Sequence, residues 1–164
     1  MLFRSVRATL DFAEVGDLNL HVRSLPAFNT DSRIIPTVRS NGVLMVQACP
    51  TGGTISGSSS VFHLSGWNWE DALIKSDDGI HLNWPEYQRL SGVKDTLKTG
   101  RIRRKQAEII DFFQEAAAYA KSDTKERNLK MEALRGVFSG EQRVYVHCHQ
   151  ARSIADALIM LDQT

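Results

Sequence analysis

The chain has 164 residues, of which 42% are hydrophobic and 24% charged, a composition typical of an ordinary globular protein. Twenty Lys and Arg residues against 19 Asp and Glu residues leave a formal net charge of +1, so we expect no nucleic-acid partner and no anionic membrane. No apolar stretch is long enough to span a membrane, and Asp11 and Glu14 interrupt the N-terminal segment before a secretion signal could form. The compartment is not encoded, and a cytoplasmic location is the default expectation.

A short helix and a strand are the first predicted elements. A helix capped by Asp31 or Ser32 is predicted, with Ile34, Ile35 and Val38 on one face and with its end at Asn41-Gly42. Residues 43–49, VLMVQAC, form a nearly continuous apolar run. Such a run predicts a strand that is buried on both faces.

A segment rich in glycine, serine and tryptophan follows. We expect residues 50–100 to be a long loop insertion over a functional site, because compact domains keep most connections short. His63, Trp67 and Trp69 are its candidate substrate-binding residues, with packing as the alternative for the tryptophans. The acidic residues of the WNWED motif fit either acid-base chemistry or the first turn of a helix. The glycines of TGGTISG are assigned a conformational role.

The C-terminal third alternates helical and strand patterns. Helices are predicted from about Arg103 and over residues 129–138, a strand over 143–147, and a last helix from Ala151. In the first helix the predicted buried stripe is Ala107, Ile110, Phe113, Ala117 and Ala120, and in the last it is Ile154, Leu158 and Leu161. This order favours an α/β fold with parallel strands, in which chemistry collects at the carboxyl ends of the strands.

Two histidines mark the end of the 143–147 strand in RVYVHCHQARS. His147 and His149 would share one face if the strand continued through Cys148. Neutral imidazole is a common zinc ligand, so His147 is a candidate metal ligand and His149 a second candidate. A polar strand end with hydrogen-bonded rings stays open as the alternative, because zinc sites take three or four protein ligands and the other histidines are scattered in the sequence.

Three longer motifs occur in order along the chain: DLNLHVRSLPAFNTDSRIIPTVRSNGV, then NGVLMVQACPTGGTISGSSSVFHLSGWNWEDAL with GIHLNWP after it, then YVHCHQARSIADAL. They resemble the metal-dependent amidohydrolases of the imidazolonepropionase-like group. The resemblance implies a partial (β/α)8 TIM barrel in which RVYVH is the fifth strand. It also implies that His147 binds a divalent metal, expected to be zinc, and that His149 lines the pocket.

The function implied by this resemblance is hydrolysis of a C–N bond in an amide, cyclic amide or dipeptide by metal-activated water. Of the ligands and the aspartate that the family uses, this sequence supplies His147 alone. We therefore expect residues 1–164 to be a single domain, an internal portion of the barrel from about strand one or two to strand five, which is inactive in isolation. Exposed sheet edges would make it a homo-oligomer.

Two other function classes stay open. The chain could be a self-contained α/β binding or scaffolding module without catalysis. A nucleophilic site that combines Cys49 or Cys148 with His149 is disfavoured for the adjacent pair, because neighbouring residues on a strand point to opposite faces.

Overall fold

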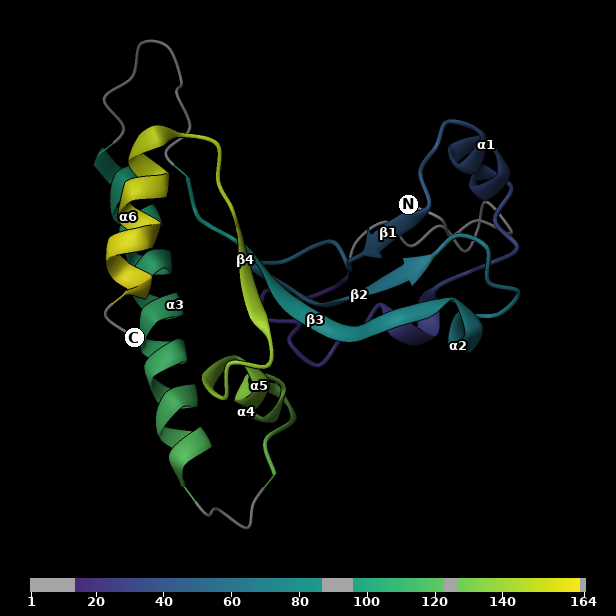
Figure 1. Ribbon diagram of the computed structural model, residues 1–164. Coiled ribbons are helices and arrows are strands. Elements are labelled where there is room, and N and C mark those ends of the chain that lie inside the picture. Colours follow the sequence, from purple (N-terminus) through teal and green to yellow (C-terminus); the bar gives the residue numbers. More distant parts are fainter. Residues whose placement is uncertain (1–13, 87–95, 123–126, 163–164) are drawn as a thin grey trace.

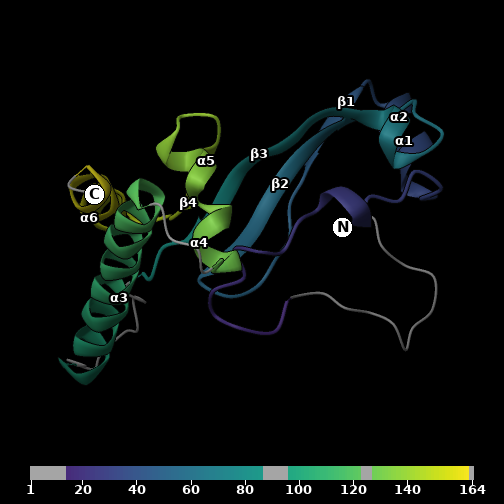
Figure 2. The same cartoon turned by 90° about the horizontal axis from the view of Figure 1, so that it is seen from below.

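Four strands form one curled sheet. The computed structural model describes residues 14–86, 96–122 and 127–162. In chain order the elements are the 3-10 helix η2 (Leu25–Ala27), α1 (Ile34–Ser40), β1 (Met45–Ala48), β2 (Ile55–His63), α2 (Trp69–Ala72), β3 (Leu73–Asn83), α3 (Thr96–Lys121), α4 (Leu129–Ala133), α5 (Arg135–Phe138), β4 (Arg143–His147) and α6 (Ala151–Leu161). Helices α3 and α6 lie side by side near β4, and α1 and α2 lie at the far end of the sheet (Figures 1 and 2).

The order of strands in the sheet is β1-β2-β3-β4. β2 is antiparallel to both β1 and β3, whereas β3 and β4 are parallel. The two strands predicted from the sequence, β1 and β4, therefore run in the same direction, with β2 and β3 between them. In the parallel pair, His81 lies opposite Tyr145 and Asn83 lies opposite His147, so both strands end at the same edge of the sheet.

The prediction of a long loop over residues 50–100 is wrong, because this segment contains β2, α2 and β3. β2 reads as a loop because it contains Ser58, Ser59 and Ser60, yet all three are buried. The hydroxyl groups of Ser58 and Ser59 donate hydrogen bonds to the Asp77 side chain and to a backbone carbonyl of β3, and that of Ser60 accepts one from the Asp77 backbone. Satisfied hydroxyl groups carry little burial penalty, so a serine-rich segment forms a central strand.

A bulge in β3 supplies these partners. The register changes between the pairs Ser59–Gly79 and Val61–Lys75, which leaves two extra residues on β3. Asp77 has a positive φ of 45°, an uncommon conformation for a residue with a side chain. Its carboxylate binds Arg23 and its carbonyl oxygen accepts a hydrogen bond from the Gln142 side chain, and these contacts hold the bulge in place.

Two hydrophobic clusters stabilise the sheet. The larger packs α3, α4 and α6 on strands β2 to β4 and comprises Leu20, Ile55, Ile80, Leu82, Trp84, Ile109, Phe113, Ala116, Met131, Leu134 and Ala157. The smaller surrounds Phe62 near α1 and α2 and comprises Leu25, Phe28, Ile35, Phe62, Leu64 and Ala72. Within it the rings of Phe28 and Phe62 stack with centroids 4.0 Å apart. β2 and β3 connect the two clusters.

The predicted helices and strands are present, but some buried faces differ. β1 alternates exposed and half-buried residues, so the prediction that it is buried on both faces is wrong. In α3 the buried stripe contains Gln106 and Ile109, whereas Ala107 is exposed. This buried position accommodates a polar residue because the Gln106 side chain donates a hydrogen bond to the carbonyl oxygen of Pro85.

Helix α6 packs on the core with an unexpected face. Ser153 and Ala157 are buried, whereas Ile154 and Leu158, predicted to point inward, are 42% and 67% exposed. Small side chains let a helix approach closely, which explains why the face with Ser153 and Ala157 packs on the core. Leu161 packs against the larger cluster as predicted.

The residues predicted as one helix over 129–138 form two short helices, α4 and α5. Within the described ranges, no helix combines the length and the apolar character that crossing a membrane requires. The fold is mixed α/β with a curled four-stranded sheet, and the interpretation of this sheet as part of a (β/α)8 barrel stays a prediction.

Candidate functional site

Two histidines from different strands meet at the carboxyl ends of the parallel pair. His81 near the end of β3 and His147 at the end of β4 share a hydrogen bond of 2.8 Å between His81 Nδ1 and His147 Nε2. Their rings lie 5.1 Å apart with an angle of 18° between the planes. His81 is buried at 5% exposure and His147 is exposed. The pair therefore joins a buried imidazole to one that solvent or a substrate can reach.

Burial keeps His81 neutral. Desolvation first, and then the neighbouring His147, lower the pKa of His81 to about 4, although Asp78 acts in the opposite direction. The shared hydrogen bond needs one N–H donor, so two tautomeric arrangements are available. If His81 Nδ1 carries the proton and donates, His81 Nε2 has a free lone pair. If His147 Nε2 carries the proton and donates, the free lone pair is on His147 Nδ1. His81 Nε2 is buried without a hydrogen-bond partner among the described residues.

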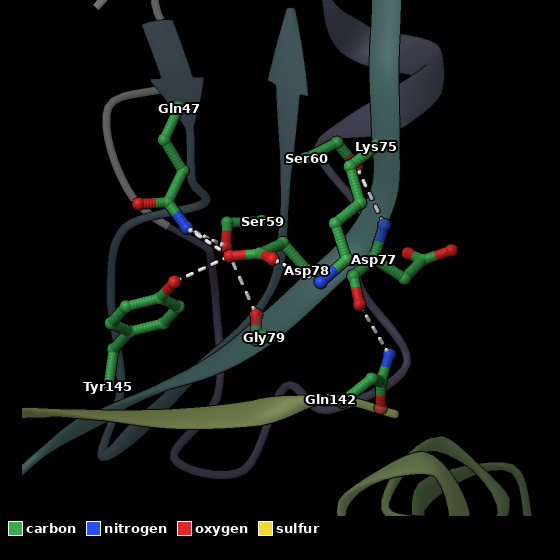
Figure 3. A network of polar contacts seen from close by, with 9 residues as sticks. All are labelled: Gln47, Ser59, Ser60, Lys75, Asp77, Asp78, Gly79, Gln142 and Tyr145. Atoms are coloured by element: carbon green, nitrogen blue, oxygen red, sulfur yellow. Dashed lines mark hydrogen bonds and ion pairs between the residues drawn. The ribbon is translucent and has the colours of Figure 1, made fainter. Parts of the chain in front are cut away.

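Tyr145 is the third aromatic residue at this site. Its ring lies against His81 with centroids 5.0 Å apart and an angle of 23°. Its hydroxyl group donates a hydrogen bond to Asp78 Oδ2, and Figure 3 shows the two side chains converging with Gln47. Hydrogen bonds from Lys75 and then from Tyr145 lower the pKa of Asp78 below its ordinary value, so Asp78 is a carboxylate at neutral pH.

His149, the second predicted ligand, lies apart from this pair. β4 ends at His147, so the alternation that would have put both histidines on one face stops there. The backbone N–H groups of His149 and Gln150 donate to Glu86 Oε1, and His149 Nδ1 lies 3.4 Å from Glu86 Oε2. These backbone hydrogen bonds lower the pKa of Glu86, which therefore acts as a charged cap near the start of α6.

The predicted substrate-binding residues lie near the opposite end of β3. On β2 the pairing partners of Leu73 and His81 are Phe62 and Gly57, five steps of extended strand apart, which corresponds to roughly 17 Å. His63 Nδ1 contacts the Ser65 hydroxyl group at 2.9 Å and His63 Nε2 contacts the carbonyl oxygen of Asp71 at 2.7 Å. The structure therefore does not bring His63 to His147.

The tryptophans lie near the same α2 turn. Trp67 is 80% exposed, and Trp69 packs against the smaller hydrophobic cluster. The Asp71 carboxylate accepts a hydrogen bond from the Trp67 backbone, and Asn68 caps α2 by accepting one from the Asp71 backbone. The helix-turn interpretation of the WNWED motif therefore explains Asp71, and substrate binding by the tryptophans stays a prediction.

The cysteines show no sign of activation. Cys49 is exposed and Cys148 is partly buried. Desolvation raises the pKa of both thiols, whereas a nucleophilic cysteine requires a lowered pKa. The geometry gives the cysteine-histidine site no support.

An open pocket of about 800 Å³ lies near the opposite end of β4, between the sheet and α4 and α5. Arg23 and Asp77 in its wall form an ion pair, and Lys75 binds Asp78. These charges already have partners, and the other titratable residues in the lining are His21, Glu132 and Glu141.

The donor type of the histidine pair fits a metal ion, but the number of donors does not. The described residues contain no group of three or more His, Cys, Asp or Glu side chains that could hold a metal ion. Zinc takes three or four protein ligands, so the described residues do not by themselves form a complete metal site.

This chain is similar to the solved structure of an amidohydrolase from Thermotoga maritima MSB8. The TM-score is 0.72 with 21% sequence identity, over 91% of this chain and 42% of the Thermotoga chain. This chain has an amidohydrolase-like fold. It spans less than half the length of that neighbour, and at this identity the likeness shows the fold alone. No family model matches the sequence, and the search of curated proteins found no match.

Sequence reasoning missed two members of the site, His81 and Tyr145. His81 belongs to GIHLNWP, a segment assigned to the loop. Its signal is the alternation of Ile80, His81 and Leu82, which predicts a strand with the histidine on the face opposite the apolar pair.

Proposed function

We propose that this chain forms part of the catalytic domain of a hydrolase that cleaves C–N bonds in small amides, cyclic amides or dipeptides. The observation that supports the proposal best is the contact between His81 and His147 at the carboxyl ends of adjacent parallel strands. Catalytic groups in α/β folds collect at this edge. The amidohydrolase-like fold and the sequence motifs that resemble the imidazolonepropionase-like group point to the same chemistry.

The proposal includes a divalent metal, zinc, with His147 as one of its ligands. When bound, such an ion supplies Lewis-acid activation of water. His147 is exposed and would bind through Nδ1 while its Nε2–H group donates to His81 Nδ1. A metal-binding histidine usually donates its second N–H group to a fixed acceptor, which orients the ring. The remaining ligands would come from outside the described residues.

Under this arrangement His81 has a role of its own. A charged imidazolium at position 81 would have no lone pair on Nδ1 and would repel a cation bound to His147. The lowered pKa, about 4, keeps His81 neutral across the physiological range. His81 Nδ1 would thus accept a hydrogen bond from the Nε2–H group of His147 and orient the His147 ring toward the substrate.

The experiment is a hydrolysis assay with the complete native gene product, using a panel of small amides, cyclic amides and dipeptides. We expect His147→Ala to lower kcat/KM by about 100-fold or more, and His81→Ala to lower it by about 10- to 100-fold, the range for hydrogen-bond partners of metal ligands. His21→Ala is the matched control, because His21 is exposed, and it should stay within about two-fold of wild type, as surface changes usually do. Full activity in the His147→Ala protein would refute the assignment.

Residues 1–164 alone should not turn over substrate, since the described residues supply too few ligands. We expect this chain to bind zinc only weakly, and His147→Ala to abolish the binding in a calorimetric titration. Metal-dependent hydrolysis by the isolated chain would show that the ligand set proposed here is wrong.

A further inference from the structure

The aromatic stack at the carboxyl edge begins with Tyr145. This residue lies opposite His81 in the parallel register and two positions before His147 on the same strand. The Tyr145 ring covers one side of His81, with centroids 5.0 Å apart. His147 contacts the edge of the buried imidazole through the shared hydrogen bond, with the two ring planes nearly parallel. The orientation of His81 therefore depends on these two neighbours.

The Tyr145 hydroxyl group is anchored by the Asp78 carboxylate, which belongs to a hydrogen-bond network with members on all four strands. Asp78 on β3 accepts the Tyr145 hydroxyl hydrogen bond from β4. It also accepts one from Gln47 on β1 at 3.1 Å, and Gln47 in turn donates to the Ser59 hydroxyl group on β2 at 3.0 Å. Lys75 lies 2.6 Å from the other carboxylate oxygen. Figure 3 shows these side chains meeting on one side of β3, with Asp77 directed away from them.

Gly79 makes room for the tyrosine ring. A Cβ atom at this position would lie 2.7 Å from Tyr145 Cε2 and 2.6 Å from the carbonyl oxygen of Arg143. The ring therefore lies directly on the backbone of β3, between the anchoring carboxylate and His81. A tyrosine that was held only by its hydroxyl group would not need this close approach.

We propose that Tyr145 is a positioning residue, which fixes the ring of His81 so that its Nδ1 atom meets His147 Nε2. The inference rests on the proposed function for its purpose, but the contact it describes is measurable without any reaction. The torsion about the Cβ–Cγ bond of histidine has broad energy wells, so a hydrogen bond to an exposed partner does not alone define the ring. Tyr145 supplies the flat surface and Asp78 holds that surface in place.

The test compares Tyr145→Phe, which keeps the ring and removes the hydroxyl group, with Tyr145→Leu, which removes the ring. Nitrogen-15 NMR of histidine-labelled chain at pH 7 reports the protonation of each ring nitrogen and the shared hydrogen bond of His81 and His147. We expect Tyr145→Phe to weaken the signature of the shared bond and Tyr145→Leu to abolish it. With zinc alone as the probe, Tyr145→Phe should weaken binding by about three- to ten-fold, at or below the range for hydrogen-bond partners of metal ligands.

Tyr119→Phe is the matched control. Its hydroxyl group donates to Glu132 Oε2 at 3.2 Å, between α3 and α4, so the variant loses the same kind of bond away from the histidine pair. It should leave the histidine signals unchanged. Unchanged signals in folded Tyr145→Phe and Tyr145→Leu proteins would overturn the proposal, and so would equal changes in the control.

If Tyr145→Leu does not fold, Tyr145→Phe decides the question alone. The two experiments can also disagree. If the Tyr145 variants change the histidine signals but His147→Ala keeps full hydrolytic activity, the positioning role is retained and the proposed function is rejected. The two failures are thus distinguishable.

Discussion

Replacing Asp78 by asparagine tests the stability of the network that spans the four strands. The side chain of Asp78 is only 7% exposed and lies 2.6 Å from Lys75 Nζ. Its second oxygen accepts hydrogen bonds from Gln47 and Tyr145. Asparagine keeps the shape and one acceptor oxygen, but it removes the charge and places an amide N–H₂ group where the carboxylate accepts.

The expected cost follows from these contacts. A hydrogen bond to a charged group contributes about 1.5–3 kcal/mol and a neutral one about 0.5–1.5 kcal/mol. In the variant, the hydrogen bonds from Gln47 and Tyr145 become neutral, and the ion pair with Lys75 is lost. The ion pair contributes little because Lys75 is half exposed. Together these changes predict a decrease of about 2 kcal/mol in the free energy of unfolding. For a chain of this length, that decrease lowers Tm by roughly 4–8 °C.

Urea and thermal unfolding followed by circular dichroism measure this change. Asp156→Asn is the matched control, because Asp156 lies 3.9 Å from Arg152 on the surface of α6, and such pairs contribute about 0.5 kcal/mol or less. An Asp78→Asn chain that is as stable as the control would refute the reasoning, since it would show that the buried carboxylate contributes no net stability.

The free energy of unfolding should decrease as the pH falls from about 6.5 to about 4, because in this range the unfolded chain binds a proton at His81 that the folded chain, with a His81 pKa of about 4, does not bind. In urea unfolding across this range, His81→Gln should show a shallower pH dependence of stability than the wild type. An unchanged slope would contradict the buried neutral imidazole. Gly79→Ala should cost about 1–3 kcal/mol by overpacking against Tyr145, whereas Gly100→Ala in α3, which has open space around it, should stabilise by about 0.5–1 kcal/mol; thermal unfolding that ranks them in the reverse order would argue against the close ring contact. Leu158→Lys on the exposed face of α6 should shift a self-associated chain toward monomer in size-exclusion chromatography with light scattering, and a clean wild-type monomer at all concentrations would remove the expectation of a homo-oligomer.

The local side-chain pattern was sufficient to predict the elements that depend least on tertiary contacts. The β-branched and aromatic run before His147 predicts a strand, and β4 has the predicted bounds Arg143–His147. The helix predicted from Ala151 begins at that residue. In both cases a single period of side chains identifies the element, because that period is a property of neighbouring residues alone.

The buried faces were harder to predict, since a period shows that a helix has an apolar face but not which neighbour it meets. In α6 the apolar residues Ile154 and Leu158 remain exposed, and Ser153 and Ala157 pack on the core. β2 shows the same dependence. Ser58 and Ser60 are compatible with a central strand because the bulge at Asp77 provides hydrogen-bond partners for their hydroxyl groups.

Local sequence patterns were enough to identify the strand that ends in His147, the helix that follows it, and the motifs that suggested amidohydrolase chemistry. The hydrogen-bond partner of His147 depends on how the whole sheet packs. His81 is 66 residues away along the chain and becomes its partner through the parallel pairing of β3 and β4. The physical reason is that side-chain alternation fixes the face of a residue within its own strand, whereas packing of the whole sheet fixes which strands become neighbours.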